Sequence, residues 1–199
     1  RPGTVTAFAG PSGAGKSTLV ACLLSDITPD AGQIRLRAQA SSRDDEGLAL
    51  TDVDPTSWRS AISWVPQSPT LVPGTILDNM GDLPQRDLDE AARATGFDAV
   101  LATTPDGWNS TIGSGGVGLS VGQRQRLALT RALAARSQVV VLDEPTAHLD
   151  AVSEETVVRA IHAMREEGRT VIVIAHRNAI IEVADTIIDV AHADEEALA

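Results

Sequence analysis

Short apolar runs alternate with longer amphipathic stretches along this chain. Five runs have the length and composition of buried strands, namely residues 4–9, 61–65, 138–143, 170–175 and 185–190. The stretch after the first run, and the stretch before the fourth, instead repeat apolar residues at helical spacing. The residues at this spacing are Leu19, Leu23 and Ile27 in the first stretch, and Val157, Ile161 and Met164 on one face of a second helix over residues 150–167. Strands and helices that alternate in this way predict an α/β fold with a mostly parallel sheet.

The middle third of the chain reads as mainly helical. Asp87-x-x-Glu90 has the spacing of a capping box at a helix start, and a glycine-rich loop over residues 107–118 comes before the next helix. Ser120 and Gln123 have the same spacing, so Ser120 is the expected N-cap of that helix.

This change of pattern divides the chain. We expect residues 1–69 and 136–199 to form one core subdomain and residues 70–135 to form an inserted helical subdomain. The chain opens at Arg1, not at methionine, and passes within a few residues into a strand, so we expect a cut inside a longer polypeptide. No apolar run approaches the roughly 18 residues that span a bilayer.

Composition narrows the classes of partner. The 199 residues are 43% hydrophobic, enough for one core with a small second lobe. Acidic residues outnumber basic ones by 27 to 16, and with a net charge of −11 we expect no nucleic-acid partner. The one cysteine, Cys22, excludes a disulfide framework and a cysteine zinc site, which favours a reducing, cytosol-facing compartment. The three tryptophans, Trp58, Trp64 and Trp108, are expected to pack rather than to bind.

The first strand runs into a glycine-rich segment that matches G-x-x-x-x-G-K-[ST] over residues 10–17. Its glycines let successive backbone N–H groups point at phosphate oxygens, and the helix that follows adds its positive end. We expect Lys16 to reach the β- and γ-phosphates of ATP and the Ser17 hydroxyl to ligate Mg²⁺. The strand before and the helix after argue against a chance glycine turn. The expected nucleotide-binding residues are Gly10, Pro11, Ser12, Gly13, Ala14, Gly15, Lys16, Ser17 and Thr18.

An acidic pair ends the apolar run over residues 138–143. Open α/β sheets bind ligands at the carboxyl ends of their strands, which is where Asp143 and Glu144 fall. We expect Asp143 to hold Mg²⁺, usually through water, and Glu144 to act as the general base toward the attacking water. The alternative is a pair of acids that caps a loop.

The segment Leu119-Ser120-Val121-Gly122-Gln123 resembles the signature sequence of the ABC transporter family. In that family the signature binds the γ-phosphate held by the opposite subunit. The resemblance therefore implies a head-to-tail dimer around two ATP, with Ser120, Gly122 and Gln123 acting in trans. Val121 stands where the family usually has glycine.

Further motifs of the family follow in order. Gln67 resembles the Q-loop glutamine that contacts Mg²⁺ and the lytic water. Residues 147–150 resemble the D-loop, whose Asp150 would also act in trans, and His176 resembles the H-loop switch histidine. The family's adenine-stacking aromatic residue would lie before Arg1.

Other residues resemble exporter-type domains, which are fused behind a transmembrane domain. They are Trp58-Arg59, Gly74-Thr75-Ile76, Asn79 and a glycine-rich X-loop over residues 112–116, in which Ser114 replaces the usual glutamate. Val121, Ser63-Trp64-Val65-Pro66-Gln67 and the Gly-Val-Gly-Leu-Ser run further resemble the CydD-type half of the CydDC exporter. That family is associated with export of thiols such as cysteine or glutathione and with cytochrome bd assembly.

The resemblance implies a Mg²⁺-dependent ATPase at the cytoplasmic face of the cell membrane, with its transmembrane domain upstream of this chain. Three other classes share some of these motifs. A small-molecule P-loop kinase would not explain Ser120 to Gln123 or His176, and a DNA-repair ATPase would carry a coiled coil or zinc cysteines. A soluble ABC-type ATPase that regulates a ribosome or DNA partner without transport usually has two such domains and basic linkers.

Overall fold

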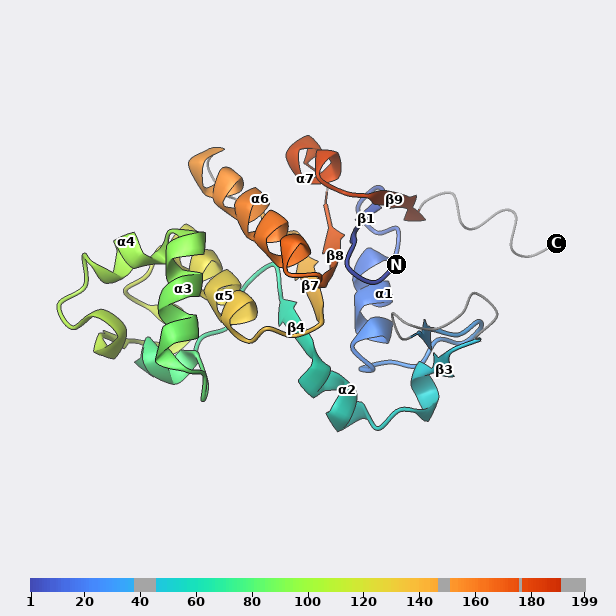
Figure 1. Ribbon diagram of the computed structural model, residues 1–199, viewed down its shortest axis with the longest axis horizontal. Helices are drawn as coiled ribbons and strands as arrows, with labels where there is room; N and C mark the ends of the chain where they lie inside the picture. Colours follow the sequence, from blue (N-terminus) through green and yellow to red (C-terminus); the bar gives the residue numbers. More distant parts are fainter. Residues whose placement is uncertain (38–45, 147–150, 176, 191–199) are drawn as a thin grey trace.

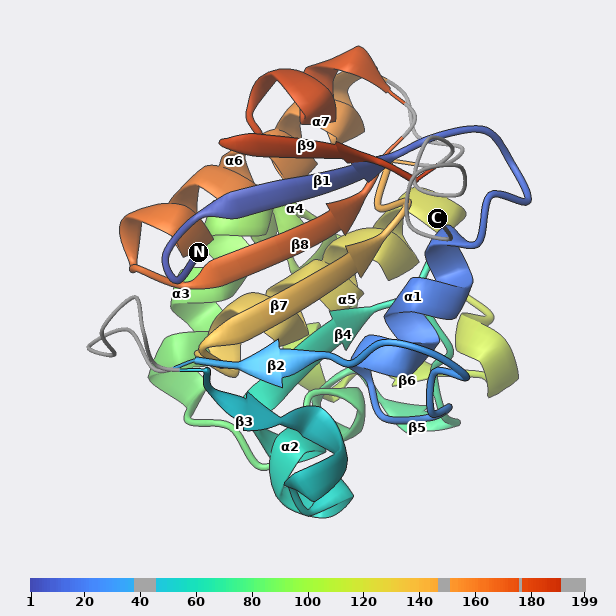
Figure 2. The same cartoon turned by 90° about the vertical axis from the view of Figure 1, so that its right-hand side faces the viewer.

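A parallel sheet forms the centre of the computed structural model, which describes residues 1–37, 46–146, 151–175 and 177–190, with the side chains of residues 151–153 left out. Its strands are β1 (Val5–Ala9), β4 (Ile62–Val65), β7 (Val139–Asp143), β8 (Thr170–Ile174) and β9 (Thr186–Asp189). They lie in the order β4-β7-β8-β1-β9, and every neighbouring pair is parallel (Figure 2). The five predicted strands and the predicted α/β class are confirmed.

Side chains of β7 alternate between two apolar clusters, one on each face of the sheet. Val140 and Leu142 pack on the side of the long helices, whereas Val141 packs with Val20 and Trp58 on the side of the first helix. Since successive residues of a strand point to opposite faces, a run of apolar residues requires cover on both sides. Figure 1 shows α1 (Lys16–Leu23) on one side of the sheet and α5 (Val121–Ala134) and α6 (Ala151–Glu166) on the other.

The first helix is shorter than the apolar stretch that contains Leu19, Leu23 and Ile27. It ends at Leu23, and its buried apolar residues are Val20 and Cys22, followed by Leu24 just beyond its end. Leu19 is 40% exposed and Ile27, which lies past the helix, is 46% exposed. Of the three residues at helical spacing, Leu23 is partly buried against the core. Because all five residues from Leu19 to Leu23 are apolar, spacing alone does not single out one face.

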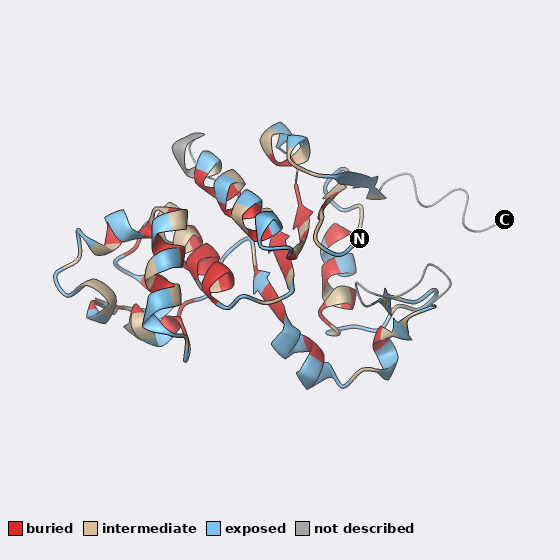
Figure 3. Cartoon of the chain, in the orientation of Figure 1, coloured by how far each residue is buried: buried red, intermediate tan, exposed pale blue. Residues whose placement is uncertain are grey.

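Three helices and a short hairpin make up the insertion. The helices are α3 (Gln85–Thr95), α4 (Phe97–Leu101) and α5, and the hairpin pairs β5 (Gly74–Thr75) with β6 (Thr111–Ile112). Figure 3 shows α5 buried along much of its length. One apolar cluster includes Leu88 of α3, Leu127 of α5, Ile161 of α6 and Val171 of β8. The division into subdomains at residues 69/70 and 135/136 stays a prediction.

The predicted capping box at Asp87 and Glu90 is wrong. The helix begins three residues earlier than that cap predicts, at Gln85, with Pro84 as its N-cap. Both carboxylates instead accept from Arg136 Nη2, over 3.0 and 3.1 Å.

By contrast, the predicted face of Val157, Ile161 and Met164 on α6 is buried as expected.

Smaller elements complete the architecture. Strands β2 (Arg35–Leu36) and β3 (Leu48–Ala49) form an antiparallel pair, α2 (Pro55–Ala61) leads into β4, and α7 (Asn178–Glu182) leads toward β9. Short 3-10 turns cover Leu50–Asp52, Leu77–Asn79, Gly107–Asn109 and Ser114–Gly116. Among the described residues, no helix combines the length and the apolar character needed to cross a membrane.

Two of the three tryptophans pack as predicted. Trp58 is 8% exposed and donates from Nε1 to the Leu23 carbonyl over 2.6 Å. Trp108 lies with its ring centroid 6.0 Å from that of Phe97. Trp64 on β4 is 44% exposed, so the expectation of packing is wrong for this residue.

Candidate nucleotide-binding site

The glycine-rich loop over residues 10–15 connects the end of β1 to the start of α1. Gly13 and Gly15 have φ of 85° and 91°, in the region that L side chains rarely adopt. A Cβ at either position would meet open space, so backbone conformation is the constraint and not crowding. Gly15 is also the N-cap of α1 and offers no side chain to the first N–H groups of the helix. The first N–H groups of α1 therefore have no side-chain cap, and together with the positive end of the helix dipole they suit a phosphate.

Lys16 stabilises this loop through two hydrogen bonds to its backbone. The residue is only 5% exposed, and its ammonium donates to the carbonyls of Gly10, over 2.9 Å, and Pro11, over 2.7 Å. A lysine ammonium has three N–H donors, so one more is available for an anion held by the loop.

Gln67 and Glu144 come together at the carboxyl end of neighbouring strands. Gln67 follows β4 and Glu144 follows β7, and Val65 of β4 is in register with Leu142 of β7. Gln67 Nε2 donates to Glu144 Oε2 over 2.8 Å. The structure thus joins the expected general base to the expected Q-loop residue, 77 positions apart in the sequence.

Glu144 has an unusual backbone conformation. Its φ is 45°, in the left-handed region, and its N–H donates to the Ile174 carbonyl at the end of β8 over 3.1 Å. Non-glycine residues in this region are strained and cluster at functional sites.

Asp143 lies beside these groups as the last residue of β7. Burial raises the pKa of the Asp143 carboxyl above its usual value, the charge of Glu144 raises it further, and Lys16 opposes both effects. The carboxyl therefore lies within electrostatic reach of the phosphate loop and of the candidate base.

The expected Mg²⁺ ligands are an incomplete set by themselves. Ser17, Gln67 and Asp143 offer hydroxyl, amide and carboxylate oxygens, which are the hard donors that Mg²⁺ prefers. Within the described ranges, no group of three or more His, Cys, Asp or Glu side chains could hold a metal ion. This donor set fits Mg²⁺ bound together with phosphate oxygens, which take up the remaining coordination positions.

The helix after the signature begins with the predicted capping box. Gln123 N–H donates to Ser120 Oγ over 3.2 Å, and Ser120 N–H donates to Gln123 Oε1 over 2.8 Å. Val121 is 51% exposed and Gly122 is half-buried, so the start of α5 is open to a partner. Whether Ser120, Gly122 and Gln123 bind nucleotide stays a prediction.

Two predicted site residues, Asp150 and His176, lie outside the described residues. The described segments that flank them are linked, because Arg177 Nη1 donates to Glu154 Oε2 over 2.6 Å. Sequence patterns did not single out this ion pair, which joins the first turns of α6 and the start of α7.

Asn79 and the X-loop have structural roles that the sequence did not specify. The Asn79 side chain accepts from Val72 N–H and donates to the Val72 and Thr75 carbonyls, and it thereby fixes the loop ahead of α3. In the X-loop, Gly116 has a φ of 80°, which L side chains rarely adopt, and a Cβ there would lie 2.6 Å from Arg124 Cδ, so the Arg124 side chain would have to move.

The model of the ABC transporter family matches residues 1–147, and this chain belongs to that family. It is 40% identical over 190 residues to the ATP-dependent lipid A-core flippase of Burkholderia pseudomallei (strain 1710b), covering 94% of this chain and 30% of that protein. It is 38% identical over 193 residues to the mycobactin import ATP-binding/permease protein IrtB of Mycolicibacterium thermoresistibile, covering 94% and 31%.

Solved structures show the same relationship. A bacterial Atm1-family ABC exporter with ATP bound superposes with a TM-score of 0.83 at 32% identity, over 96% of this chain and 32% of that chain. The predicted P-loop NTPase fold is confirmed, and the chain is an ATP-binding domain of the exporter type. It spans about a third of the length of these relatives.

Proposed function

We propose that this chain is the ATP-hydrolysing motor domain of an ABC exporter. It works head-to-tail with a second such domain, identical or not, at the cytoplasmic face of a membrane, and drives a transmembrane domain that lies outside this chain. The observation that carries the proposal is the hydrogen bond between Gln67 and Glu144 beside Asp143, at the sheet edge that also carries the phosphate loop.

The groups at this edge divide the tasks of the proposed reaction among them. Backbone N–H groups within residues 10–18, where Pro11 has none, and the Lys16 ammonium bind the ATP phosphates. Ser17, Gln67 and Asp143 would hold Mg²⁺. When bound, Mg²⁺ neutralises charge on the phosphate oxygens. Glu144 orients the attacking water and accepts its proton, and the bond from Gln67 fixes the direction of the carboxylate.

The second half of each site comes from the partner. Ser120, Gly122, Gln123 and Asp150 act in trans, and His176 acts in cis as the switch residue. In support, α5 and α1 lie on opposite sides of the sheet, so each would face a nucleotide on a different subunit (Figure 1). ATP binding closes the pair and hydrolysis reopens it.

The cargo is a narrower proposal. Val121 and the runs over residues 63–67 and 116–120 resemble the CydD-type subunit, which supports a thiol such as cysteine or glutathione. Uptake of labelled glutathione into inverted vesicles that carry the full transporter tests this point. Uptake of lipid or siderophore in its place contradicts it.

The variant Glu144→Gln separates binding from hydrolysis. We expect it to bind ATP normally and to hydrolyse it roughly 100-fold or more slowly, because it keeps the shape of the side chain and loses the base. With ATP and Mg²⁺, light scattering should show a shift from monomer to dimer. Lys16→Ala should lose phosphate binding and remain monomeric.

The matched control is Glu155→Gln, the same change on an exposed position of α6. It should hydrolyse ATP at the parental rate. A parental rate in Glu144→Gln rules out the general-base role. A monomer that still binds ATP indicates an obligate different partner or a need for the transmembrane domain.

A further inference from the structure

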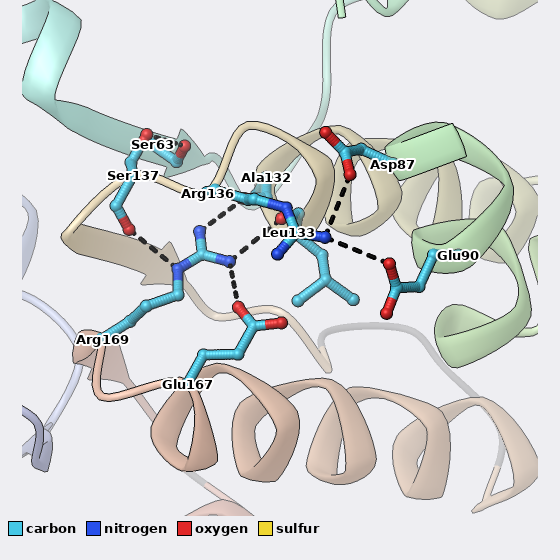
Figure 4. Close-up of polar contacts among 9 residues, drawn as sticks. All are labelled: Ser63, Asp87, Glu90, Ala132, Leu133, Arg136, Ser137, Glu167 and Arg169. Atoms are coloured by element: carbon cyan, nitrogen blue, oxygen red, sulfur yellow. Dashed lines mark hydrogen bonds and ion pairs between the residues drawn. The ribbon is translucent and has the colours of Figure 1, made fainter. Parts of the chain in front are cut away.

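Arg169 is a charged side chain buried where α6 turns into β8. It is 2% exposed, and its guanidinium donates to three backbone carbonyls (Figure 4). Nη2 donates to Ala132 over 2.6 Å, Nη1 to Leu133 over 3.1 Å and Nε to Ser137 over 2.8 Å. All three acceptors lie in the last turn of α5 or in the link from α5 to β7.

The arginine and the helix end satisfy each other. The last four carbonyls of a helix have no partner within the helix, and they carry the negative end of its dipole. A buried guanidinium needs acceptors for its N–H groups, or its desolvation is not offset. Burial lowers the pKa of Arg169, and Glu167, at 3.4 Å from Nη1, opposes that shift.

Further bonds gather the starts of three strands around this point. Ser63 at the start of β4 bonds through its hydroxyl to the Ser137 hydroxyl, over 2.8 Å, and Ser137 precedes β7. Arg169 itself precedes β8. The cluster therefore lies at the amino ends of the strands, opposite to the edge that carries Gln67 and Glu144.

On the protein surface, Arg136 links the end of α5 to α3. Arg136, with φ of 51°, directs its guanidinium to Asp87 and Glu90 of α3. These exposed ion pairs contribute little, since solvent screens them. The buried bonds of Arg169, by contrast, join the end of α5 to the residue that directly precedes β8.

We infer that Arg169 is a positioning residue that fixes the far end of α5, so that Ser120 at its other end keeps its place relative to the phosphate loop. The inference rests on the proposed function for its link to hydrolysis. With 14 residues, α5 is about 21 Å long, and a tilt of about 10° at Arg169 displaces Ser120 by about 4 Å. Misplacement of a binding group by about 1 Å can slow a reaction roughly 100-fold.

A distance measurement tests the positioning directly. We place spin labels at two exposed positions, Asp52→Cys in the predicted core subdomain and Asp98→Cys in α4. Cys22→Ala removes the native thiol. We expect one narrow distance distribution in the parent without nucleotide. Arg169→Met should broaden it, and Arg169→Lys, whose point charge cannot form the three-carbonyl fork, should broaden it less.

Two outcomes overturn the inference. One is a folded Arg169→Met protein with the parental distribution. The other applies if Arg169→Met does not fold. In that case, an Arg169→Lys protein with a lower melting temperature but the parental distance distribution shows that Arg169 only stabilises the fold. Arg136→Gln is the control on the protein surface and should leave the distribution narrow.

Nucleotide measurements on the same variants connect position to reaction. ATP affinity of the monomer should stay within about twofold in Arg169→Met, while turnover falls about tenfold or more. Lost ATP affinity, or parental turnover with a broadened distribution, overturns the link to hydrolysis. Failure of the proposed function appears separately, as parental turnover in Glu144→Gln.

Discussion

Glu144 combines a strained backbone with a directed side chain. Its left-handed φ of 45° turns the chain sharply after β7, and the carboxylate meets Gln67 as a result. Left-handed conformations cost an L-residue about 1–2 kcal/mol relative to glycine. The site thus holds conformational energy at the residue that we propose as the base.

Two substitutions at this position measure the strain. Glu144→Gly should exceed Glu144→Ala in free energy of unfolding by about 1 kcal/mol, because only glycine is relaxed at this φ. Urea denaturation of the two proteins gives the difference. Equal stabilities indicate that φ is relaxed in solution.

Asp143 also costs stability at a residue for which we propose a function. Its pKa is raised, so the folded state favours the protonated form, and this contribution to stability is lost as the pH rises through the folded pKa. At neutral pH the charged carboxyl therefore destabilises the nucleotide-free protein. We expect Asp143→Asn to melt at a higher temperature than the parent at pH 7, with the gap closing in acid, and to lose Mg²⁺-dependent hydrolysis. A lower melting temperature at pH 7 contradicts this.

Residue types and their order along the chain were enough to predict the phosphate loop, Asp143, Glu144 and Gln67 as candidate site residues. The bond between Gln67 and Glu144 depends on the pairing of β4 with β7, which no local pattern specifies. Arg169 was missed for a similar reason, because its acceptors are backbone carbonyls more than 30 positions away.

At the level of elements, α5 is held at both ends. A capping box closes its first turn, and Arg169 closes its last. The capping box was predictable because both partners lie within four residues, whereas the register of α1 and the start of α3 depend on tertiary contacts. In α3, Asp87 and Glu90 have the spacing of a cap and serve as partners of Arg136.

Removal of the cap should weaken α5 measurably. We expect Ser120→Ala to lower the free energy of unfolding by about 1 kcal/mol, since it leaves the Gln123 N–H without its acceptor. Ser60→Ala is the control, because that exposed hydroxyl only donates to the Ser57 carbonyl, and its effect should stay within about 0.5 kcal/mol. Denaturant titration followed by circular dichroism compares the two, and equal effects argue against the cap.

For the whole molecule, one apolar cluster crosses from the sheet into the insertion. It includes Val171 of β8, Ile161 of α6 and Leu88 of α3. Strand and helix types followed from periodicity and glycine placement, but how the insertion joins the core did not, because contacts between distant helices leave no local pattern. The domain limits at residues 69/70 and 135/136 accordingly stay predictions.

The shared cluster implies a single unfolding transition. Trp58 packs in the core and Trp108 in the insertion, so proteins that keep one of them, with the other tryptophans changed to Phe, report on each part. We expect both fluorescence signals to change over the same range of denaturant. Separated midpoints show that the two parts unfold independently.

The last strand gives the molecule an open side. Among the residues that the structure describes, β9 stands at the end of the sheet order, is exposed at all four positions and carries Ile187 and Ile188 at 53% and 43% exposure. An uncovered edge with apolar side chains is a template on which another strand can pair. When made alone, this chain therefore has a route to self-association that needs no nucleotide, and in a concentrated preparation that route leads toward aggregates rather than a working dimer.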